Sequence, residues 1–333
     1  MTYLITGVAG FIGSTLAKRL LARGDEVIGI DNLNDYYSVQ LKKDRLEDIG
    51  RNHPKAFKFI QLDFGDMGQL QASLSPLRIK HVVHLGGQAG VRHSLTNPFA
   101  YAQSNLVGHL NMLEYCRHND NCRQMVYASS SSVYGANKKQ PFSVDDRVDH
   151  PVSLYAATKK ADELMSEAYS HLYRLPQTGL RFFTVYGPWS RPDMAYWSFT
   201  KAILAGEPIK VFNHGDMRRD FTYIDDIISG VMSCIDHPAA DDGAVKPGGS
   251  RAPHRLYNIG NNTPEPLLGM IATLEKALGI LARRELLPMQ DGDVPSTFAD
   301  IRDIQRDMGF KPTTSIDVGL PRFVDWYRKY HGV

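Results

Sequence analysis

The sequence is poor in cysteine, with three in 333 residues, and none of them stands at a spacing that would hold a metal ion. A sparse and odd set of cysteines suits a reducing compartment and argues against a disulfide framework. Positive and negative charges nearly cancel, because 38 Lys and Arg residues face 36 Asp and Glu residues. A net charge of +2 gives no long-range field that would recruit nucleic acid or an acidic lipid surface.

Long apolar runs are also absent, since none approaches the ~18 residues that a membrane span requires. The chain starts directly on the apolar segment TYLIT, and no basic segment typical of a secretory signal precedes it. The composition, 43% hydrophobic and 22% charged, is that of an ordinary globular protein. These features predict a cytoplasmic protein without a membrane partner.

Short apolar segments alternate with amphipathic segments through the first half of the chain. We expect strands at 2–6, 26–31, 57–63, 81–85, 124–129 and 180–187, and helices at 11–24, 67–74, 98–119 and from about 153. Apolar strands that alternate with helices are typical of a parallel sheet covered on both faces. The pattern predicts an α/β fold, a Rossmann-type doubly wound parallel sheet with a smaller α/β C-terminal lobe for substrate.

The boundary between the two domains is expected near residue 180. Residues 1–180 would form the domain built on the sheet, and 181–333 would form mainly the second lobe, with some segments returning to the sheet. The lobe is expected to pack over the carboxyl ends of the strands, where open α/β sheets bind ligands.

A glycine motif follows the first predicted strand. GVAGFIG places Gly7, Gly10 and Gly13 before an amphipathic helix, where they would permit a tight turn, close approach of a pyrophosphate and close helix packing. Asp31 ends the second strand, and a carboxylate there binds a ribose 2′-hydroxyl and repels a 2′-phosphate. NAD is therefore expected rather than NADP. Asp63, at the end of the third predicted strand, could reach the adenine or simply cap a turn or a helix.

Tyr155 and Lys159, in YAATK, are four residues apart in a predicted helix, so their side chains share one face. A free tyrosine has a pKa of about 10 and is a poor base. An ammonium one turn away and a positively charged nicotinamide favour the phenolate. The pair could then take a proton from a sugar hydroxyl as hydride leaves its carbon. Two unrelated surface side chains would give the same spacing. The catalytic interpretation therefore depends on the position of the pair, after the fifth strand and downstream of the glycine motif.

Four serines in a row, at 129–132, follow a predicted strand in ASSSSVYG. Buried hydroxyls need hydrogen-bond partners, so the run is either a surface linker or the wall of a polar site. Ser129 is expected merely to satisfy backbone groups at the strand end.

Together these motifs resemble the extended short-chain dehydrogenase/reductase (NAD-dependent epimerase/dehydratase) family. More narrowly, DNLNDYYSVQLKKDRL, HLGGQAGVRHSLTNP, RFFTVYGPWSRPDM and MRRDFTYIDDI resemble bacterial UDP-glucuronate 4-epimerases, and the resemblance covers nearly the whole chain. It implies conversion of UDP-glucuronate to UDP-galacturonate through a transient 4-keto sugar, with NAD regenerated in each cycle. Residues 1–180 would then be the NAD-binding domain, and 181–333 would be mainly the UDP-sugar-binding lobe. It also suggests a homodimer. The helices near 98 and 153 have apolar residues spread wider than one core-facing stripe, so they are expected to pair with the second subunit.

The resemblance carries site residues over one by one. It implies the catalytic residues Tyr155, Lys159 and Ser130. It implies cofactor contacts from Gly7, Gly10, Phe11, Ile12, Gly13, Asp31, Asn32, Asp63, Leu85, Gln88, Asn105, Tyr155, Lys159 and Phe182. It implies substrate contacts from Ser130, Ser131, Ser132, Tyr155, Thr184, Arg191, Val211, Phe212, Arg219 and Asp293, and no metal.

The identity of the sugar depends on a few of these positions. Ser131 and Ser132 stand where sugar-nucleotide dehydratases resembling this chain carry an Asp-Glu pair, and hydroxyls can donate to a sugar carboxylate that acidic groups would repel. Arg191 is a candidate partner for that carboxylate, because a guanidinium fork matches it, although a surface arginine near a helix end fits the sequence equally well. Ser190 replaces a common glycine before Arg191, which could alter the path of this loop. By the same resemblance, Arg219 would bind the diphosphate, and Asp293 would bind the uridine ribose.

Three alternatives remain open on the sequence. The nearest is a 4-epimerase of neutral UDP-hexoses. A net oxidoreductase or a dehydratase is the second, and the missing Asp-Glu pair argues against dehydration. The third is a non-catalytic NAD-binding regulator, which would be expected to lack the tyrosine or the lysine.

Overall fold

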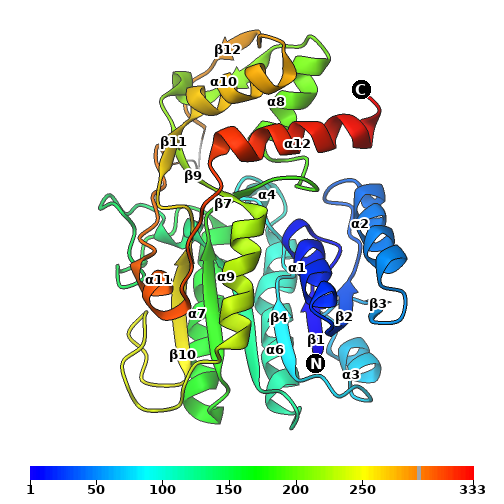
Figure 1. Cartoon of the computed structure of the whole chain (residues 1–333). Helices are drawn as coiled ribbons and strands as arrows, with labels where there is room; N and C mark the ends of the chain where they lie inside the picture. The colour runs from blue at the N-terminus through cyan, green and yellow to red at the C-terminus, as the bar shows by residue number, and fades with distance from the viewer. Residues whose placement is uncertain (291–293) are drawn as a thin grey trace.

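The computed structural model describes residues 1–290 and 294–333, and it is built on a seven-stranded parallel sheet (Figure 1). The strands lie in the order β10-β6-β5-β4-β1-β2-β3, so the chain runs outward from β1 in one direction and then in the other. They are β1 (Thr2–Thr6), β2 (Glu26–Asp31), β3 (Phe57–Gln61), β4 (His81–His84), β5 (Gln124–Ser130), β6 (Gln177–Phe182) and β10 (His254–Ile259). The predicted α/β fold with a doubly wound sheet is confirmed.

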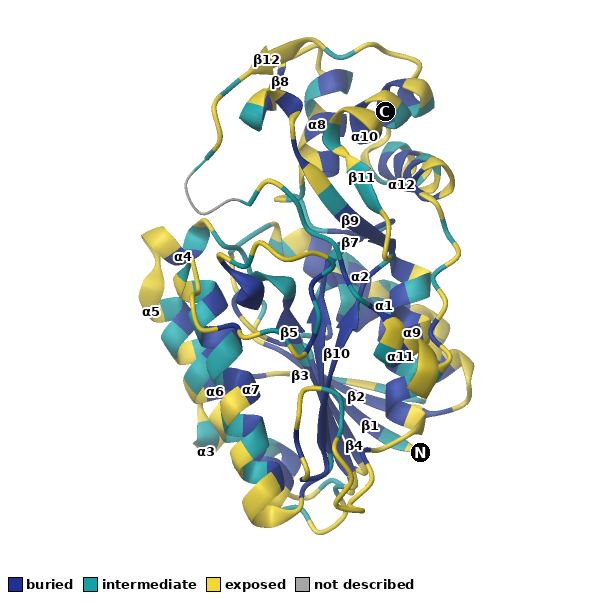
Figure 2. Cartoon of the chain, turned by 90° about the vertical axis from the view of Figure 1, so that its left-hand side faces the viewer, coloured by how far each residue is buried: buried dark blue, intermediate teal, exposed yellow. Residues whose placement is uncertain are grey.

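Helices cover both faces of this sheet, as Figure 2 shows with the buried strands between two layers. One layer contains α1 (Phe11–Ala22), α2 (Val39–Asn52), α9 (Ile224–Asp236) and α11 (Arg302–Met308). The other contains α3 (Met67–Leu74), α6 (Gly108–Arg117) and α7 (Leu154–Tyr173). Because water is excluded from both faces, β4, β6 and β10 are buried along their whole length. They are less apolar than the sequence pattern predicted, since β6 and β10 also bury polar side chains such as Arg181 and Asn258, and the edge strand β3 is only partly buried.

Polar side chains set the start of several helices. The hydroxyl of Ser38 accepts from Leu41 N before α2, and the carboxylate of Asp66 accepts from Gln69 N before α3. Ser153 does the same for α7 by accepting from Ala156 N at 3.1 Å. Such caps satisfy backbone donors that a helix leaves without partners, so the sequence fixes where α7 begins.

The helix expected at 98–119 is present at 98–117, but it is not α-helical throughout. After the short α4 (His93–Thr96), the structure has α5 (Pro98–Tyr101), a π-helical stretch at Ala102–Val107, and then α6. The apolar pattern of an α-helix continues through the stretch, so spacing alone could not reveal it. Wider π turns occur often at functional sites, and this one carries Asn105, whose role is described below.

The single strand expected at 180–187 is two strands in two different sheets. β6 ends at Phe182, and β7 (Thr184–Tyr186) pairs with β9 (Arg218–Tyr223) in a three-stranded sheet that β11 (Pro264–Pro266) completes. Only Phe183 lies between them, and its N–H still donates to Ile259 O at 3.2 Å. Both halves are apolar, so the sequence reads as one strand although the chain changes sheets.

A smaller second lobe lies over the carboxyl ends of the large sheet, at the top of Figure 1. It contains α8 (Ala195–Leu204), α10 (Leu267–Leu278), α12 (Ile316–His331) and a parallel pair of strands, β8 (Ile209–Val211) and β12 (Arg284–Leu286). Its segments are not contiguous, because the chain returns to the sheet layers for α9, β10 and α11. Within the described residues, no helix combines the length and apolar character needed to cross a membrane.

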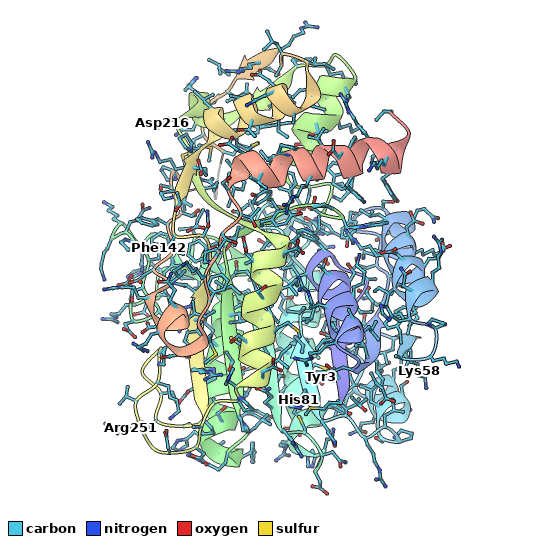
Figure 3. All side chains as sticks on the ribbon, viewed as in Figure 1. Tyr3, Lys58, His81, Phe142, Asp216 and Arg251 are labelled. Carbon is cyan, nitrogen blue, oxygen red and sulfur yellow. The ribbon has the colours of Figure 1, made fainter. Side chains whose placement is uncertain are left out.

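Phe142 lies at the boundary of the two lobes, while Asp216 lies in the upper lobe and Tyr3 and His81 lie far below (Figure 3). The Phe142 N–H donates to Phe298 O at 2.7 Å, and its carbonyl accepts from Asp300 N at 2.9 Å. The segment after β5 and the segment before α11 are therefore joined by backbone hydrogen bonds at this boundary.

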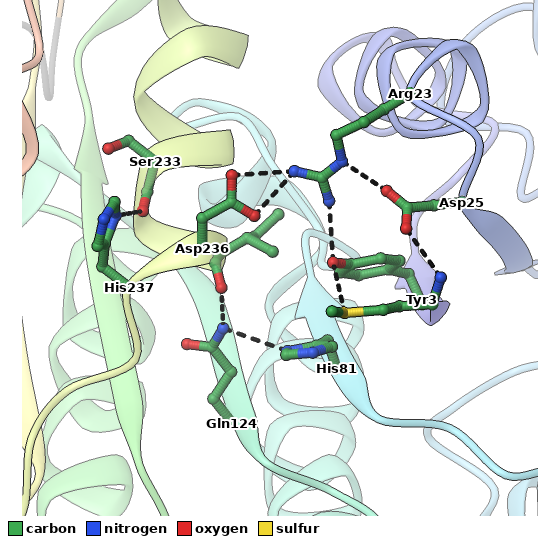
Figure 4. Close-up of polar contacts among 10 residues, drawn as sticks. Tyr3, Arg23, Asp25, His81, Gln124, Ser233, Asp236 and His237 are labelled. Carbon is green, nitrogen blue, oxygen red and sulfur yellow. Dashed lines mark hydrogen bonds and ion pairs between the residues drawn. The ribbon is translucent and has the colours of Figure 1, made fainter.

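A separate polar network closes the amino end of the sheet (Figure 4). Arg23 binds Asp236 through distances of 2.8 and 2.9 Å and also binds Asp25 and the Tyr3 hydroxyl. These contacts join the ends of α1 and α9 at the opposite end from the carboxyl ends of the strands. We therefore assign them to stability.

Candidate active site

A cavity of about 700 Å³ opens where the carboxyl ends of the sheet strands meet the second lobe. It is lined by segments that follow β1, β2, β4, β5 and β6, and it includes most of the predicted site residues. These are Gly7, Gly10, Phe11, Ile12, Gly13, Asp31, Asn32, Leu85, Gln88, Ser130, Ser131, Ser132, Tyr155, Lys159, Phe182, Thr184, Arg191, Phe212 and Arg219. Residues far apart in the sequence are thus brought together at the edge where such folds bind ligands.

Four of the predicted site residues are not among the residues that line this cavity. Asp293 lies outside the described residues. Val211 is buried at the end of β8. Asp63 accepts from Asn32 Nδ2 at 3.0 Å and from Gly65 N at 2.8 Å, so it holds a cavity residue and a turn. Asn105 is buried and acts through Gln88, as described next.

The π-helical stretch places the Asn105 amide against the loop after β4. Its Oδ1 accepts from Gln88 N at 2.8 Å, and its Nδ2 donates to Gln88 O at 3.1 Å and to Thr158 Oγ1 at 3.0 Å. One side chain thus satisfies both backbone groups of Gln88 and ties them to α7. Asn105 therefore orients the loop wall of the cavity.

The glycine loop between β1 and α1 leaves no room for side chains at its glycine positions. Gly7 has φ +67°, and a Cβ there would lie 2.8 Å from Gly86 Cα. A Cβ on Gly13 would overlap the carbonyl oxygen of Gly7. Bare backbone therefore faces the cavity at the start of α1, where N–H groups and the helix dipole favour phosphate. This cradle fits the pyrophosphate of a dinucleotide.

Asp31 closes the same end of the cavity. Its Oδ2 accepts from Ala9 N at 3.2 Å, and its Oδ1 accepts from Leu33 N at 2.9 Å. Burial raises the pKa of this carboxyl, although the two N–H donors oppose that effect. A fixed carboxylate at the end of β2 fits a ribose 2′-hydroxyl and disfavours a 2′-phosphate.

Asp31→Ala should weaken NAD binding by about tenfold to a hundredfold, because a hydrogen bond to a charged group is lost. It should also reduce the ratio of the affinity for NAD to the affinity for NADP. Calorimetric titration of cofactor-stripped protein with both dinucleotides measures both effects. Asp35→Ala, an exposed carboxylate four residues on, is the matched control and should leave both affinities unchanged. Unaltered NAD affinity in Asp31→Ala would remove Asp31 from the cofactor site.

Tyr155 and Lys159 lie on the first turns of α7, which begins at the carboxyl edge of the sheet. The buried Lys159 Nζ donates to Ala128 O and to Asp162 Oδ2, each at 3.0 Å. Burial acts to lower the pKa of Lys159, but Asp162 and Tyr155 outweigh it and raise that pKa. The side chain is therefore held as an ammonium. The ring of Tyr101 packs edge-on against Tyr155, with centroids 6.0 Å apart.

The serine run forms part of the cavity wall. Ser130 Oγ accepts from Ser132 N at 3.1 Å and so starts the 3-10 turn Ser131–Tyr134. Ser131 and Ser132 are half-buried and line the cavity, so the run is not a surface linker. The expectation for Ser129 is wrong, because its hydroxyl donates to the Glu163 carboxylate at 2.6 Å rather than to backbone.

Arg191 reaches the cavity from the loop after β7, but it already has a carboxylate partner. Its Nε and Nη2 donate to the two oxygens of Asp193 at 3.0 and 2.9 Å. The Tyr36 hydroxyl donates to Asp193 at 3.4 Å. A sugar carboxylate would have to share or exchange this guanidinium.

Arg45, on α2, fastens the loop of Arg191 to the glycine loop. The guanidinium is buried and donates to the carbonyls of Ala9 at 2.8 Å, Trp189 at 2.6 Å and Ser190 at 2.9 Å. The unusual backbone of this loop is at Trp189, with φ +65°, rather than at Ser190. The guanidinium of Arg45 thus holds together the glycine loop, predicted to bind the cofactor, and the loop of Arg191, predicted to bind the substrate.

Sequence reasoning missed Asp162, Arg45 and Asp193. A signal existed for Arg45, because it stands between the buried Leu41 and Ile49 at helical spacing. Asp162 is three residues after Lys159 on the buried face of α7. Asp193 gave none. In the part of the chain that the structure describes, no group of His, Cys, Asp and Glu could hold a metal ion.

Comparison with known proteins agrees with this geometry. The NAD dependent epimerase/dehydratase family matches residues 3–260. The chain is 52% identical to Protein CapI of Staphylococcus aureus over 99% of both chains. It is 46% identical to UDP-glucuronate 4-epimerase 4 of Arabidopsis thaliana over 99% of this chain and 76% of that protein. A UDP-glucuronic acid 4-epimerase from Bacillus cereus, solved with UDP-glucuronic acid and NAD, superposes with a TM-score of 0.85 at 32% identity, covering 99% of this chain and 100% of that one.

Proposed function

Since this chain belongs to the NAD dependent epimerase/dehydratase family, we propose that it interconverts UDP-glucuronate and UDP-galacturonate by inverting C4. The observation that carries the proposal is one cavity that joins the glycine loop, the Tyr155–Lys159 pair and a wall of neutral serines. The relatives named UDP-glucuronate 4-epimerase, and the neighbour solved with UDP-glucuronic acid and NAD, support the choice of substrate and cofactor.

The glycine loop and Asp31 would hold NAD, which supplies a hydride acceptor and donor at the sugar carbon. Tyr155, as phenolate, accepts the proton of the C4 hydroxyl and later returns it. Lys159, fixed by Ala128 O and Asp162, stabilises the phenolate by its positive charge. Ser130 binds the same hydroxyl from the end of β5. Proton transfer by such a group contributes about 10²–10⁴-fold to the rate.

Inversion requires the 4-keto sugar to turn while its nucleotide stays bound. Arg219, from β9, would hold the diphosphate, and Phe212 lines the same side of the cavity. The walls beside the sugar are short hydroxyl side chains, which permit rotation better than long charged ones. Binding would thus be firm at the nucleotide and loose at the sugar.

The substrate adds a hazard, because a 4-keto hexuronate is a β-keto acid and tends to lose CO₂. The enzyme must hold the carboxylate so that its bond to C5 does not overlap the ketone. Ser131, Ser132 and Thr184 would donate hydrogen bonds to it, and Arg191 would contribute part of its guanidinium while Asp193 keeps the rest. Neutral donors suit an anion, whereas acidic residues at 131–132 would repel it.

Thr184→Val should raise the fraction of decarboxylated pentose product several-fold, because a donor to the carboxylate is lost while side-chain shape is kept. Chromatography of the nucleotide sugars formed from UDP-glucuronate measures the ratio. Thr222→Val is a matched control on the neighbouring β9, since Thr222 is fully buried and does not line the cavity. An unchanged product ratio in Thr184→Val would exclude this role.

Proton NMR of the purified protein with UDP-glucuronate and no added NAD tests the proposed function. The C4 epimer should accumulate to equilibrium without net reduction of dinucleotide. Parallel samples with UDP-glucose test the nearest alternative, because hydroxyl donors can also bind the C6 hydroxyl of a neutral hexose. Epimerisation of UDP-glucose alone would overturn the assignment to uronates, and no epimerisation of either sugar would overturn 4-epimerisation.

The proposal includes a homodimer formed through the layer that contains α6 and α7. Large apolar side chains are exposed along this face, which lies at the left of Figure 2. They are Phe99, 83% exposed, Val107 and Leu110 from the segment 98–117, and Leu154, Leu164 and Leu172 from α7. Several exposed large apolar side chains on one face are typical of an interface.

Leu164→Glu should convert the protein from dimer to monomer, because a charge would be buried in the interface. Light scattering coupled to gel filtration measures the mass. Leu281→Glu is the matched control, since Leu281 is even more exposed but lies in the second lobe. A dimer that survives in Leu164→Glu would place the interface elsewhere.

A further inference from the structure

Asp162 is a buried carboxylate that the sequence motifs do not include, and so far it has served only as a hydrogen-bond partner of Lys159. It follows Lys159 by three residues on the inner face of α7, and its Oδ2 accepts from Lys159 Nζ at 3.0 Å. The side chain of Asp162 is 1% exposed, and that of Lys159 is 6% exposed. The contact therefore lies inside the protein, directly behind the cavity that Tyr155 lines.

The two charged groups have few other hydrogen-bond partners. Lys159 donates otherwise only to Ala128 O among the described residues, and the Oδ1 of Asp162 has no hydrogen-bond partner there. A buried carboxylate oxygen without a partner is unusual in a site that serves packing alone. The position of Asp162 is thus explained by Lys159 rather than by a network of its own.

The other titratable groups nearby do not replace this role. Glu163, the next residue on α7, is held by Arg181. His84 from β4 and His109 from α6 approach the same region. Burial and the Lys159 charge lower the pKa of His84 to about 3, and burial holds the pKa of His109 well below its usual value. Both rings are therefore neutral.

A carboxylate beside an ammonium weakens the ability of that ammonium to stabilise another anion nearby. The charge of Lys159 favours the phenolate of Tyr155, whereas an ionised Asp162 offsets part of that charge. Burial raises the pKa of Asp162 to about 6, against the opposing effect of Lys159. Asp162 is therefore ionised at neutral pH and becomes neutral under mildly acid conditions.

We propose that Asp162 is a positioning residue for proton transfer, and this inference rests on the proposed function. Its carboxylate fixes the ammonium of Lys159 beside Tyr155. Its negative charge also delays ionisation of the phenol to higher pH than the ammonium alone would give. The hydrogen bond to Lys159 should raise the rate, whereas the negative charge of Asp162 should lower it. Two substitutions can separate these effects.

Asp162→Asn keeps a hydrogen-bond acceptor of the same shape and removes the charge. The acid limb of the pH profile of kcat/KM for UDP-glucuronate should move to lower pH by about one unit, because the phenolate forms more easily. Asp162→Leu removes the acceptor as well, and kcat should also fall about tenfold or more, because Lys159 is no longer held. A profile of Asp162→Asn that coincides with that of the wild type would overturn the proposal.

Glu167→Gln is the matched control, since it removes the same charge from the same helix. Glu167 lies two turns after Lys159 and binds His254 at 2.8 Å rather than the lysine. Its profile should coincide with that of the wild type. An equal shift in Glu167→Gln would mean that any charge on α7 has the effect, and the specific role of Asp162 would be lost.

A second measurement needs no turnover. Ultraviolet absorbance of ionised tyrosine, taken as the difference between each protein and its Tyr155→Phe counterpart, follows the phenol in NAD-loaded protein. The transition should lie at lower pH in Asp162→Asn than in the wild type. If it does and no UDP-sugar is epimerised, the proposed function fails while the role of Asp162 stands. If epimerisation occurs and the transition does not move, the role of Asp162 fails alone.

Discussion

Tyr155→Phe should lose C4 inversion by about 10²–10⁴-fold, while the affinity for UDP-glucuronate stays within a few-fold of that of the wild type. The ring and its packing against Tyr101 are retained, and only the hydroxyl that moves the proton is removed. Proton NMR follows the rate of epimer formation, and calorimetry measures binding. A loss confined to the rate is expected of a group that acts in the transition state rather than in binding.

Tyr169→Phe is the matched control for this variant. Tyr169 lies on the same helix, and its hydroxyl donates to Glu114 away from the cavity. Its rate should equal that of the wild type. If Tyr155→Phe interconverted the two epimers at the wild-type rate, Tyr155 could not be the base and the proposed mechanism would be wrong.

Arg181→Met should lower the free energy of unfolding by about 3–5 kcal/mol, because it leaves a buried carboxylate without its partner. Arg181 donates to both oxygens of Glu163, at 2.8 and 2.9 Å, and each side chain is 1% exposed. Glu163 also accepts from Ser129, so the pair joins β6, β5 and α7 beneath the site. Urea denaturation measures the change.

Two further variants test the cause of this loss. Removing both charges, in Arg181→Met with Glu163→Gln, should recover part of the stability, since no unpaired charge remains. Arg174→Met breaks a pair with Asp241 on the surface and should have no measurable effect. A single Arg181→Met variant as stable as the wild type would show that the buried pair contributes nothing.

The same pair makes stability depend on pH. Burial acts to raise the pKa of Glu163, but the Arg181 guanidinium outweighs it and lowers that pKa below its usual value. A lowered folded-state pKa means that the contribution is complete above the unfolded value, about 4.3, and is lost as pH falls through the folded value. Below about pH 4 the wild type should therefore lose stability more steeply than the double variant does.

Much of the fold could be predicted because the sequence signals are local. The strands at 2–6 and 26–31 and the helix at 67–74 agree with β1, β2 and α3 to the residue. Apolar strands between amphipathic helices leave few arrangements other than a covered parallel sheet. The glycine motif could also be predicted, because it is local in the sequence. The structure explains its composition, since the close contact of Gly7 with Gly86 excludes a side chain at Gly7.

The parts that could not be predicted depend on contacts between distant segments. The π-helical stretch at Ala102–Val107 keeps an ordinary helical pattern, and the contact it contains, between the amide of Asn105 and the backbone of Gln88, is a tertiary one. The partner of Ser129 is a carboxylate 34 residues later in the chain. The roles of individual site residues remain predictions that the variants above test.

The one-residue step at Phe183 restricts how the molecule can open. The chain passes from the large sheet into the second lobe there without a flexible linker, and it passes between them again at 223–224, 259–264 and 310–316. Several short spans join the two bodies, so a clamshell motion would have to distort the chain at each of them and break the pairing of Phe183 N with Ile259 O. We therefore expect nucleotide sugars to enter and leave by local movement of surface loops, with the distance between the lobes nearly constant throughout turnover.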